Sequence, residues 1–80
     1  MTDEYNILFG KRLAEIRKEK GIAQDKLALN CDIARSFVGE VERGKRNLSL
    51  RNICKLAIGL GVTTAELLSL IDQEILKGND

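Results

Sequence analysis

The chain lacks histidine, tryptophan and proline, and it has only two cysteines. Without histidine, it offers no His-based catalytic dyad or triad and no zinc site that includes histidine. Two cysteines are too few for a four-cysteine zinc site or for the disulfide framework of small secreted domains. We therefore expect a protein that is not an enzyme and that binds no metal, cofactor or small-molecule ligand.

The chain also lacks the features of targeting and membrane segments. It begins MTDEYNILFGKR, which places acids where a signal peptide has its basic region. No apolar run approaches the ~20 residues that a membrane-spanning helix needs. We expect a cytoplasmic protein with no membrane partner. Cys31 and Cys54 both fall on apolar positions of the helical pattern, which predicts two buried, reduced thiols.

What is present favours one small all-helical domain. The 80 residues leave room for a single core, so we expect one domain over residues 1–80. Hydrophobic residues make up 44% of the chain and charged residues 31%, which is the balance of a folded domain. The absence of proline and the low aromatic content, 4%, favour helices over strands.

Hydrophobic periodicity and helix-end signals predict five helices. Apolar residues recur at intervals of three and four, as they do on one face of a helix. Gly21, Gly44 and Gly61 stand where helices commonly end. Thr63 and Glu66 have the spacing of a capping box at a helix start. The predicted helices cover residues 3–20, 24–30, 35–42, 50–60 and 63–77.

The most informative stretch is residues 24–43, QDKLALNCDIARSFVGEVER. Two short helices joined by a tight turn need a small residue where they touch and apolar residues at fixed offsets. Ala28 is the small residue here. The apolar positions are Leu27, Cys31, Ile33, Val38 and Val41. This is the spacing of a helix-turn-helix, whose second helix enters the major groove of DNA.

Three blocks in register extend this pattern over most of the chain. They are G-x-x-Q-x-x-L-A at 21–28, V-x-x-V-E-R-G at 38–44 and L-x-x-I-x-K-L-A-x-x-L at 50–60. With them, residues 9–68 resemble the Cro/repressor-like (XRE-type) helix-turn-helix family. Within it, the chain looks most like the controller proteins of restriction-modification systems. The resemblance implies an all-α, compact five-helix, lambda-repressor-like domain that binds double-stranded DNA.

Two residues depart from the family pattern. Ala23 stands where the family has Ser or Thr capping the second helix, which should cost about 1 kcal/mol of stability. Asp32 occupies the turn position where Gly is usual, although Asp adopts the left-handed conformation more readily than most residues. Both departures predict a slightly weaker turn.

The resemblance implies that side chains exposed at the start of the segment 35–42 contact base edges. The candidates are Arg35, Ser36, Phe37, Glu40 and, beyond the segment, Arg46. A guanidinium can bind guanine bidentately, so Arg35 is the strongest, with a solvated arginine as the alternative. Glu40 needs a cytosine amino group or a basic neighbour. Phe37 would contact a thymine methyl group, or else belong to the core or a dimer contact.

Contacts to the DNA backbone are expected from Gln24 and from the basic segment after residue 42. Gln24 stands at a helix start, where its amide and nearby N–H groups can meet a phosphate or simply cap the helix. The basic segment contributes Arg43, Lys45, Asn47 and Arg51. The net charge is only +1, but residues 43–65 hold five bases and no acid, whereas residues 66–80 hold four acids and one base. This distribution places the DNA-binding surface in the middle of the chain.

Two further sets of residues are predicted to have structural roles. In the family, an arginine late in the first helix pairs with the glutamate that ends the third, and Arg17 and Glu42 match these positions. The segment 63–77 has more apolar residues than one small core can cover, which predicts a homodimer through this segment and the start of the segment 3–20. Its expected interface is formed by Leu68, Leu70, Ile71 and Ile75. The alternative is a helix that folds back on its own core.

The expected function is therefore a dimeric transcriptional regulator of a near-palindromic operator. If the controller resemblance holds, it activates at one occupancy and represses at a higher one. Activation would need a surface for RNA polymerase, for which Asp25, Asp32 and Glu40 are candidates. The alternatives are a stand-alone prophage-type repressor and an antitoxin-like interaction module. The second is disfavoured because only Gly78-Asn79-Asp80 follows the last predicted helix.

Overall fold

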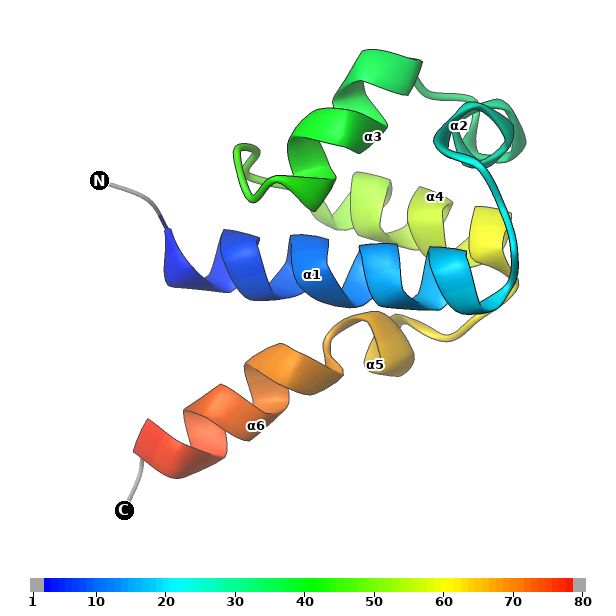
Figure 1. Ribbon diagram of the computed structural model, residues 1–80. Helices are drawn as coiled ribbons and strands as arrows, with labels where there is room; N and C mark the ends of the chain where they lie inside the picture. Colours follow the sequence, from blue (N-terminus) through cyan, green and yellow to red (C-terminus); the bar gives the residue numbers. More distant parts are fainter. Residues whose placement is uncertain (1–2, 79–80) are drawn as a thin grey trace.

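The computed structural model describes residues 3–78, which form helices and contain no strand (Figure 1). The predicted all-α class is therefore confirmed. The elements are α1 (Glu4–Glu19), α2 (Gln24–Cys31), α3 (Arg35–Glu42), α4 (Leu50–Leu60), α5 (Thr64–Leu67) and α6 (Ser69–Gly78). The first four agree with the predicted bounds to within one residue at each end. Within residues 3–78, no helix is long and apolar enough to cross a membrane.

Side-chain caps explain why three of the helices start where they do. The Asp3 carboxylate accepts a hydrogen bond from the Tyr5 amide at 2.8 Å, at the start of α1. Ser49 caps α4 in the same way, and the Thr63 hydroxyl accepts from the Glu66 amide at 3.1 Å to begin α5. These bonds satisfy amides that have no partner within the helix. The Thr63–Glu66 capping box predicted from the sequence therefore marks the start of a helix.

The predicted fifth helix, residues 63–77, is wrong as a single element, and the structure has six helices between residues 3 and 78. The chain leaves the helical path at Leu68, where φ is −96° and ψ is 4°. The Leu68 amide is shared between the carbonyls of Thr64 and Ala65, at 3.1 and 3.2 Å. The bend lets α5 insert Leu67 into the core beside α4, while α6 continues along α1.

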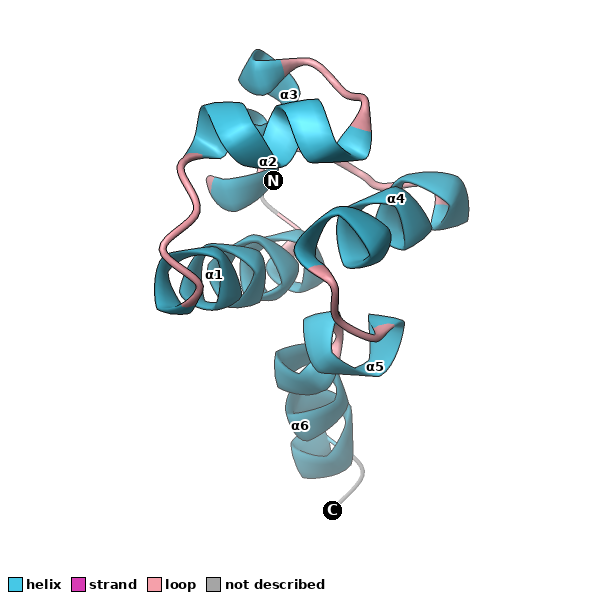
Figure 2. Ribbon diagram, turned by 90° about the vertical axis from the view of Figure 1, so that its right-hand side faces the viewer, coloured by secondary structure: helices cyan, strands magenta, loops and turns pink. Residues whose placement is uncertain are grey.

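One core joins the first five helices. Helix α1 contributes a stripe of Phe9, Leu13 and Ile16, which are all at most 3% exposed. The other helices complete the core with Leu27, Ala28, Cys31, Val38, Val41, Leu56, Ala57, Leu60 and Leu67. Helix α6 has no buried residue and lies on the opposite side of α1 from α2 and α3 (Figures 1 and 2).

Two glycines within helices let neighbouring helices approach closely. A Cβ atom on Gly10 of α1 would overlap the Val41 carbonyl oxygen and lie 2.9 Å from that of Glu42, at the end of α3. A Cβ atom on Gly59 of α4 would overlap the Cys31 sulfur in α2. Gly10 therefore sets how closely α3 lies against α1.

The prediction of two buried thiols is wrong for one of them. Cys31 is buried in the core, and this burial raises the pKa of its thiol. Cys54 is exposed, on the outer face of α4 between Leu50 and Ile58, which are 76% and 79% exposed. The residues of this stripe are apolar, but α4 already fills the core with Leu56, Ala57 and Leu60, so the pattern pointed to the wrong face.

Asn79 and Asp80, on which the argument against an antitoxin depended, lie outside the described residues.

Candidate nucleic-acid interface

Helices α2 and α3 are joined by a tight turn built around Asp32. Its φ and ψ are 55° and 49°, the left-handed conformation, and it is the sole non-glycine residue with positive φ between residues 3 and 78. The next amide, that of Ile33, donates to the Ala28 carbonyl at 3.1 Å and closes the end of α2. Asp32 therefore adopts the backbone conformation for which the family uses glycine.

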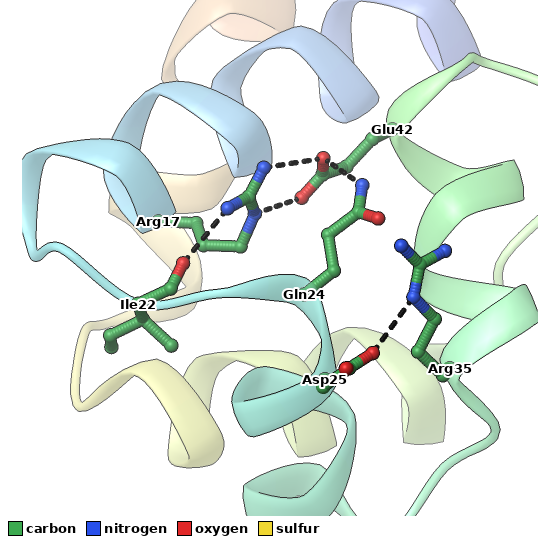
Figure 3. A network of polar contacts seen from close by, with 6 residues as sticks. All are labelled: Arg17, Ile22, Gln24, Asp25, Arg35 and Glu42. Atoms are coloured by element: carbon green, nitrogen blue, oxygen red, sulfur yellow. Dashed lines mark hydrogen bonds and ion pairs between the residues drawn. The ribbon is translucent and has the colours of Figure 1, made fainter.

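The C-terminal end of α3 is fixed by Arg17 and Glu42, which the structure brings together (Figure 3). Arg17 Nε and Nη2 donate to the two Glu42 carboxylate oxygens at 2.6 and 3.0 Å. The third donor of this guanidinium, Nη1, reaches the Ile22 carbonyl at 2.8 Å. The side chains are only 12% and 8% exposed, and the bond to Glu42 raises the pKa of Arg17. This bidentate pair ties the end of α3 to α1.

Gln24, at the start of α2, joins the same network. Its amide nitrogen donates to Glu42 Oε1 at 2.8 Å (Figure 3). A side-chain amide has two N–H groups, so this contact leaves one of them for a phosphate. Neither Ala23 nor Ala34, the N-cap residues of α2 and α3, makes a side-chain capping bond. The start of α2 is thus held by Gln24 rather than by a cap.

The start of α3 carries the exposed residues Arg35 and Ser36. Arg35 Nε donates to Asp25 Oδ1 of α2 at 2.9 Å, and the two side chains are 56% and 83% exposed. Sequence reasoning did not find this pair, because a separation of ten residues across a turn has no helical periodicity that would reveal it. The consecutive residues Gln24 and Asp25 therefore contact opposite ends of α3.

Further along α3, Phe37 and Glu40 both contact Arg46. Arg46 Nε lies 2.9 Å from Glu40 Oε2, and its guanidinium carbon lies 5.3 Å from the centre of the Phe37 ring. Glu40 thus has the basic neighbour that was one of its two expected partners. Phe37 is half-buried at the edge of the core and borders an open apolar hollow. This hollow is lined by Ile33, Ala34, Phe37 and Asn52.

The residues expected at the DNA backbone lie in the loop after α3 and at the start of α4. Arg43, Lys45, Asn47 and Arg51 are all exposed. The first three of them line a second open hollow, together with residues of the α1 start. The side-chain amide of Asn6 donates through Nδ2 to Asn47 Oδ1 at 2.9 Å, which ties this loop to α1.

The expected dimer residues lie on both sides of the bend at Leu68. Leu68, Leu70 and Ile71 are half-buried, whereas Ile75 is 45% exposed. Leu76, which was not predicted, is 69% exposed. Helix α6 therefore presents apolar residues to solvent along its C-terminal half.

Comparison with known proteins identifies the family. A family model described as helix-turn-helix matches residues 13–67. The chain is 44% identical over 69 residues to control protein C.BamHI of Bacillus amyloliquefaciens, covering 85% of each chain. It is 41% identical over 73 residues to control protein C.MunI of a Mycoplasma species, covering 90% of this chain and 99% of the relative.

Solved structures of controller proteins are also similar to this chain. The restriction-modification controller protein C.AhdI of Aeromonas hydrophila is 50% identical, with a TM-score of 0.76 over 78% of this chain and 94% of that one. The wild-type controller protein C.Esp1396I is 28% identical, with a TM-score of 0.81 over 94% and 97% of the two chains. The predicted resemblance is confirmed: the chain belongs to the XRE-type helix-turn-helix family and is similar to restriction-modification controller proteins.

Proposed function

We propose that this chain is a dimeric, sequence-specific DNA-binding regulator of the restriction-modification controller type. It would bind a near-palindromic operator, activating transcription at one occupancy and repressing it at a higher one. The observation that carries the proposal is how α3 is held against the core and which part of it is exposed. One face of this helix is buried in the core through Val38 and Val41, its C-terminal end is fixed through Glu42, and its first turn is exposed.

The exposed face of α3 supplies groups that suit the major groove. Arg35 keeps its two terminal nitrogens for the O6 and N7 atoms of a guanine, and Ser36 offers a hydroxyl beside it. The apolar hollow at Phe37 has the character needed for a thymine methyl group. Glu40 would act by holding Arg46, which lies beyond the helix and can contact a base or the minor groove.

Backbone contacts would come from the elements before and after α3. Gln24 and the α2 amides precede the helix in the chain, and the exposed residues Arg43, Lys45, Asn47 and Arg51 follow it. Phosphate contacts of this kind set the position of the protein on DNA and contribute affinity for any sequence.

A second copy of the chain is the partner we propose for α6. The helix has no buried residue, although Leu70, Ile71, Ile75 and Leu76 lie along it. Because it lies on the far side of α1 from α3, pairing through α6 leaves both recognition helices accessible (Figure 2). A two-fold dimer would then contact half-sites about 34 Å apart, one turn of DNA.

Activation would require a contact with RNA polymerase, and Asp32 is the acid we favour for it. Of the three candidate acids, Asp25 and Glu40 hold arginines of the DNA-binding surface. Asp32 is exposed at the end of α2. Loss of activation without loss of DNA binding in Asp32→Asn would support this role, whereas unchanged activation would contradict it.

The DNA-binding proposal can be tested by selecting binding sites for the wild-type chain from a pool of random duplexes. The expected result is an enriched, near-palindromic site that is bound at least about 1,000-fold more tightly than random duplex at the same salt concentration. Affinity should fall steeply with salt, since phosphate contacts release counterions. A failure to enrich any site, with equal affinity for all duplexes, would contradict sequence-specific recognition.

A further inference from the structure

Gly39 leaves a bare strip on α3 between two arginines. Arg35 precedes it by four residues and Arg43 follows it by four, so all three lie on one face of the helix. A Cβ atom on Gly39 would lie 3.5 Å from Arg35 Nη1 and 3.2 Å from Arg43 Nη1. Arg43 therefore lies tightly against the position that another residue's Cβ would take, whereas Arg35 is at ordinary van der Waals distance from it.

Asp25 fixes the same guanidinium from the other side. It accepts the Arg35 Nε–H group at 2.9 Å, and Figure 3 shows the two terminal nitrogens of Arg35 turned away from this contact. An arginine bound through Nε keeps four N–H donors on its terminal nitrogens, the edge that can bind guanine O6 and N7. The contact with Asp25 thus defines the direction of this edge.

We propose that Asp25 acts as a positioning residue that fixes Arg35 for base recognition. The inference rests on the proposed function, since it takes Arg35 as a base-contacting residue. A long exposed side chain loses rotamer freedom when it binds, and a guanidinium that is already oriented loses less. Asp25 also places a negative charge at the DNA-binding surface, which repels phosphates of every sequence. It therefore increases discrimination between sequences at the expense of general affinity.

The test is a double-mutant cycle on Asp25 and Arg35, using the site selected by the wild-type chain and a random duplex of equal length. The measured quantity is the discrimination ratio, the Kd for random duplex divided by the Kd for the selected site. We expect Asp25→Ala to lower this ratio about fivefold or more and to bind random duplex at least as tightly as wild type. In the Arg35→Ala background, Asp25→Ala should change the ratio by less than about twofold.

Asp32→Asn is the matched control, because it removes one negative charge from the other end of α2. It should bind all duplexes slightly more tightly and leave the discrimination ratio unchanged. An equal loss of discrimination from Asp25→Ala in both backgrounds, or no loss in either, would overturn the inference while leaving the function intact. If Arg35→Ala itself left the ratio unchanged, the base contact would be wrong and the inference with it.

Gly39→Ala provides a second control, because it adds a methyl group beside Arg35 and leaves Asp25 in place. Its Cβ would lie 3.5 Å from Arg35 Nη1, an ordinary van der Waals contact, and 3.2 Å from Arg43 Nη1, so only the mobile end of Arg43 has to shift. We expect the melting temperature to rise by about 4 °C, because alanine favours helix over glycine, and the discrimination ratio to stay within about twofold of wild type. A several-fold loss of discrimination in this variant would contradict positioning by Asp25 alone.

Discussion

Helices α1 to α4 direct their apolar faces into one core, whereas α6 carries Leu70, Ile71, Ile75 and Leu76 without burying any of them. Both regions have the apolar periodicity of amphipathic helices. The difference arises because Leu67 enters the core from α5, so the apolar face of α6 packs only partly, against α1 and α5. The first region therefore supplies the internal stability of the domain, and α6 is the helix for which we propose association.

The same leucine-to-alanine substitution should have very different effects on stability in the two regions. Leu13 is fully buried in α1, while Leu76 of α6 is 69% exposed. Leu13→Ala should lower the free energy of unfolding by about 3 kcal/mol, because it leaves a cavity. Leu76→Ala should change it by less than about 0.5 kcal/mol at protein concentrations where the monomer predominates. Urea denaturation measures both, and equal costs would contradict the comparison.

The polar contacts show a similar contrast between buried and exposed pairs. Removing either Arg17 or Glu42 leaves a largely buried charge without its partner, so Arg17→Ala and Glu42→Ala should each cost about 2–3 kcal/mol of stability. Arg35→Ala breaks an exposed pair and should cost less than about 1 kcal/mol. Thermal melts of the three variants compare these costs directly. Wild-type melting of both Arg17→Ala and Glu42→Ala would show that the buried pair does not hold α3.

Association through α6 can be tested by placing a charge on its exposed face. Ile75→Asp should weaken the dimer more than about tenfold, because an aspartate would be buried at the interface. Ile58→Asp, on the equally apolar outer face of α4, is the matched control and should leave the dimer unchanged. Analytical ultracentrifugation over a concentration series measures both. A wild-type chain that remains a monomer at every concentration would exclude the dimer.

The smallest expected effect lies at the start of α2. Ala23 has the extended backbone of an N-cap residue but no side chain that can accept a hydrogen bond. Ala23→Ser should raise the stability by about 1 kcal/mol. Ser49 already caps α4, so the reverse substitution, Ser49→Ala, is the control. It should lower the stability by a similar amount. Unchanged melting of Ala23→Ser would mean that the serine hydroxyl does not bond the free amides at the start of α2.

Local features of this fold could be predicted from the sequence, and features that depend on tertiary contacts could not. The starts of α4 and α5 follow from Ser49 and Thr63, because a cap and its amide lie within three residues. The bend at Leu68 left no such signal, since neither glycine nor proline marks it and apolar residues continue through it. The outward position of Cys54 likewise depends on which face of α4 the other helices cover.

The residues of the candidate interface likewise include some that the sequence predicts and some whose contacts depend on the tertiary structure. Residues of the exposed α3 turn and the Arg17–Glu42 pair followed from the family pattern, because their positions relative to the motif are fixed. The contacts of Arg35 with Asp25 and of Arg46 with Glu40 bring together residues on different elements. Charge alone did not predict which residues pair, although Arg46 is the kind of basic neighbour that the sequence left open for Glu40.

The most direct test of the account compares Arg35→Ala with Lys45→Ala on the selected site and on variants of it with single base-pair changes. We predict that Arg35→Ala abolishes the preference at one guanine in each half-site, a loss of about 1–3 kcal/mol, and retains the other preferences. Lys45→Ala should weaken binding to all duplexes alike and reduce the salt dependence by about one phosphate contact. An unchanged preference in Arg35→Ala at every position would contradict recognition through the start of α3.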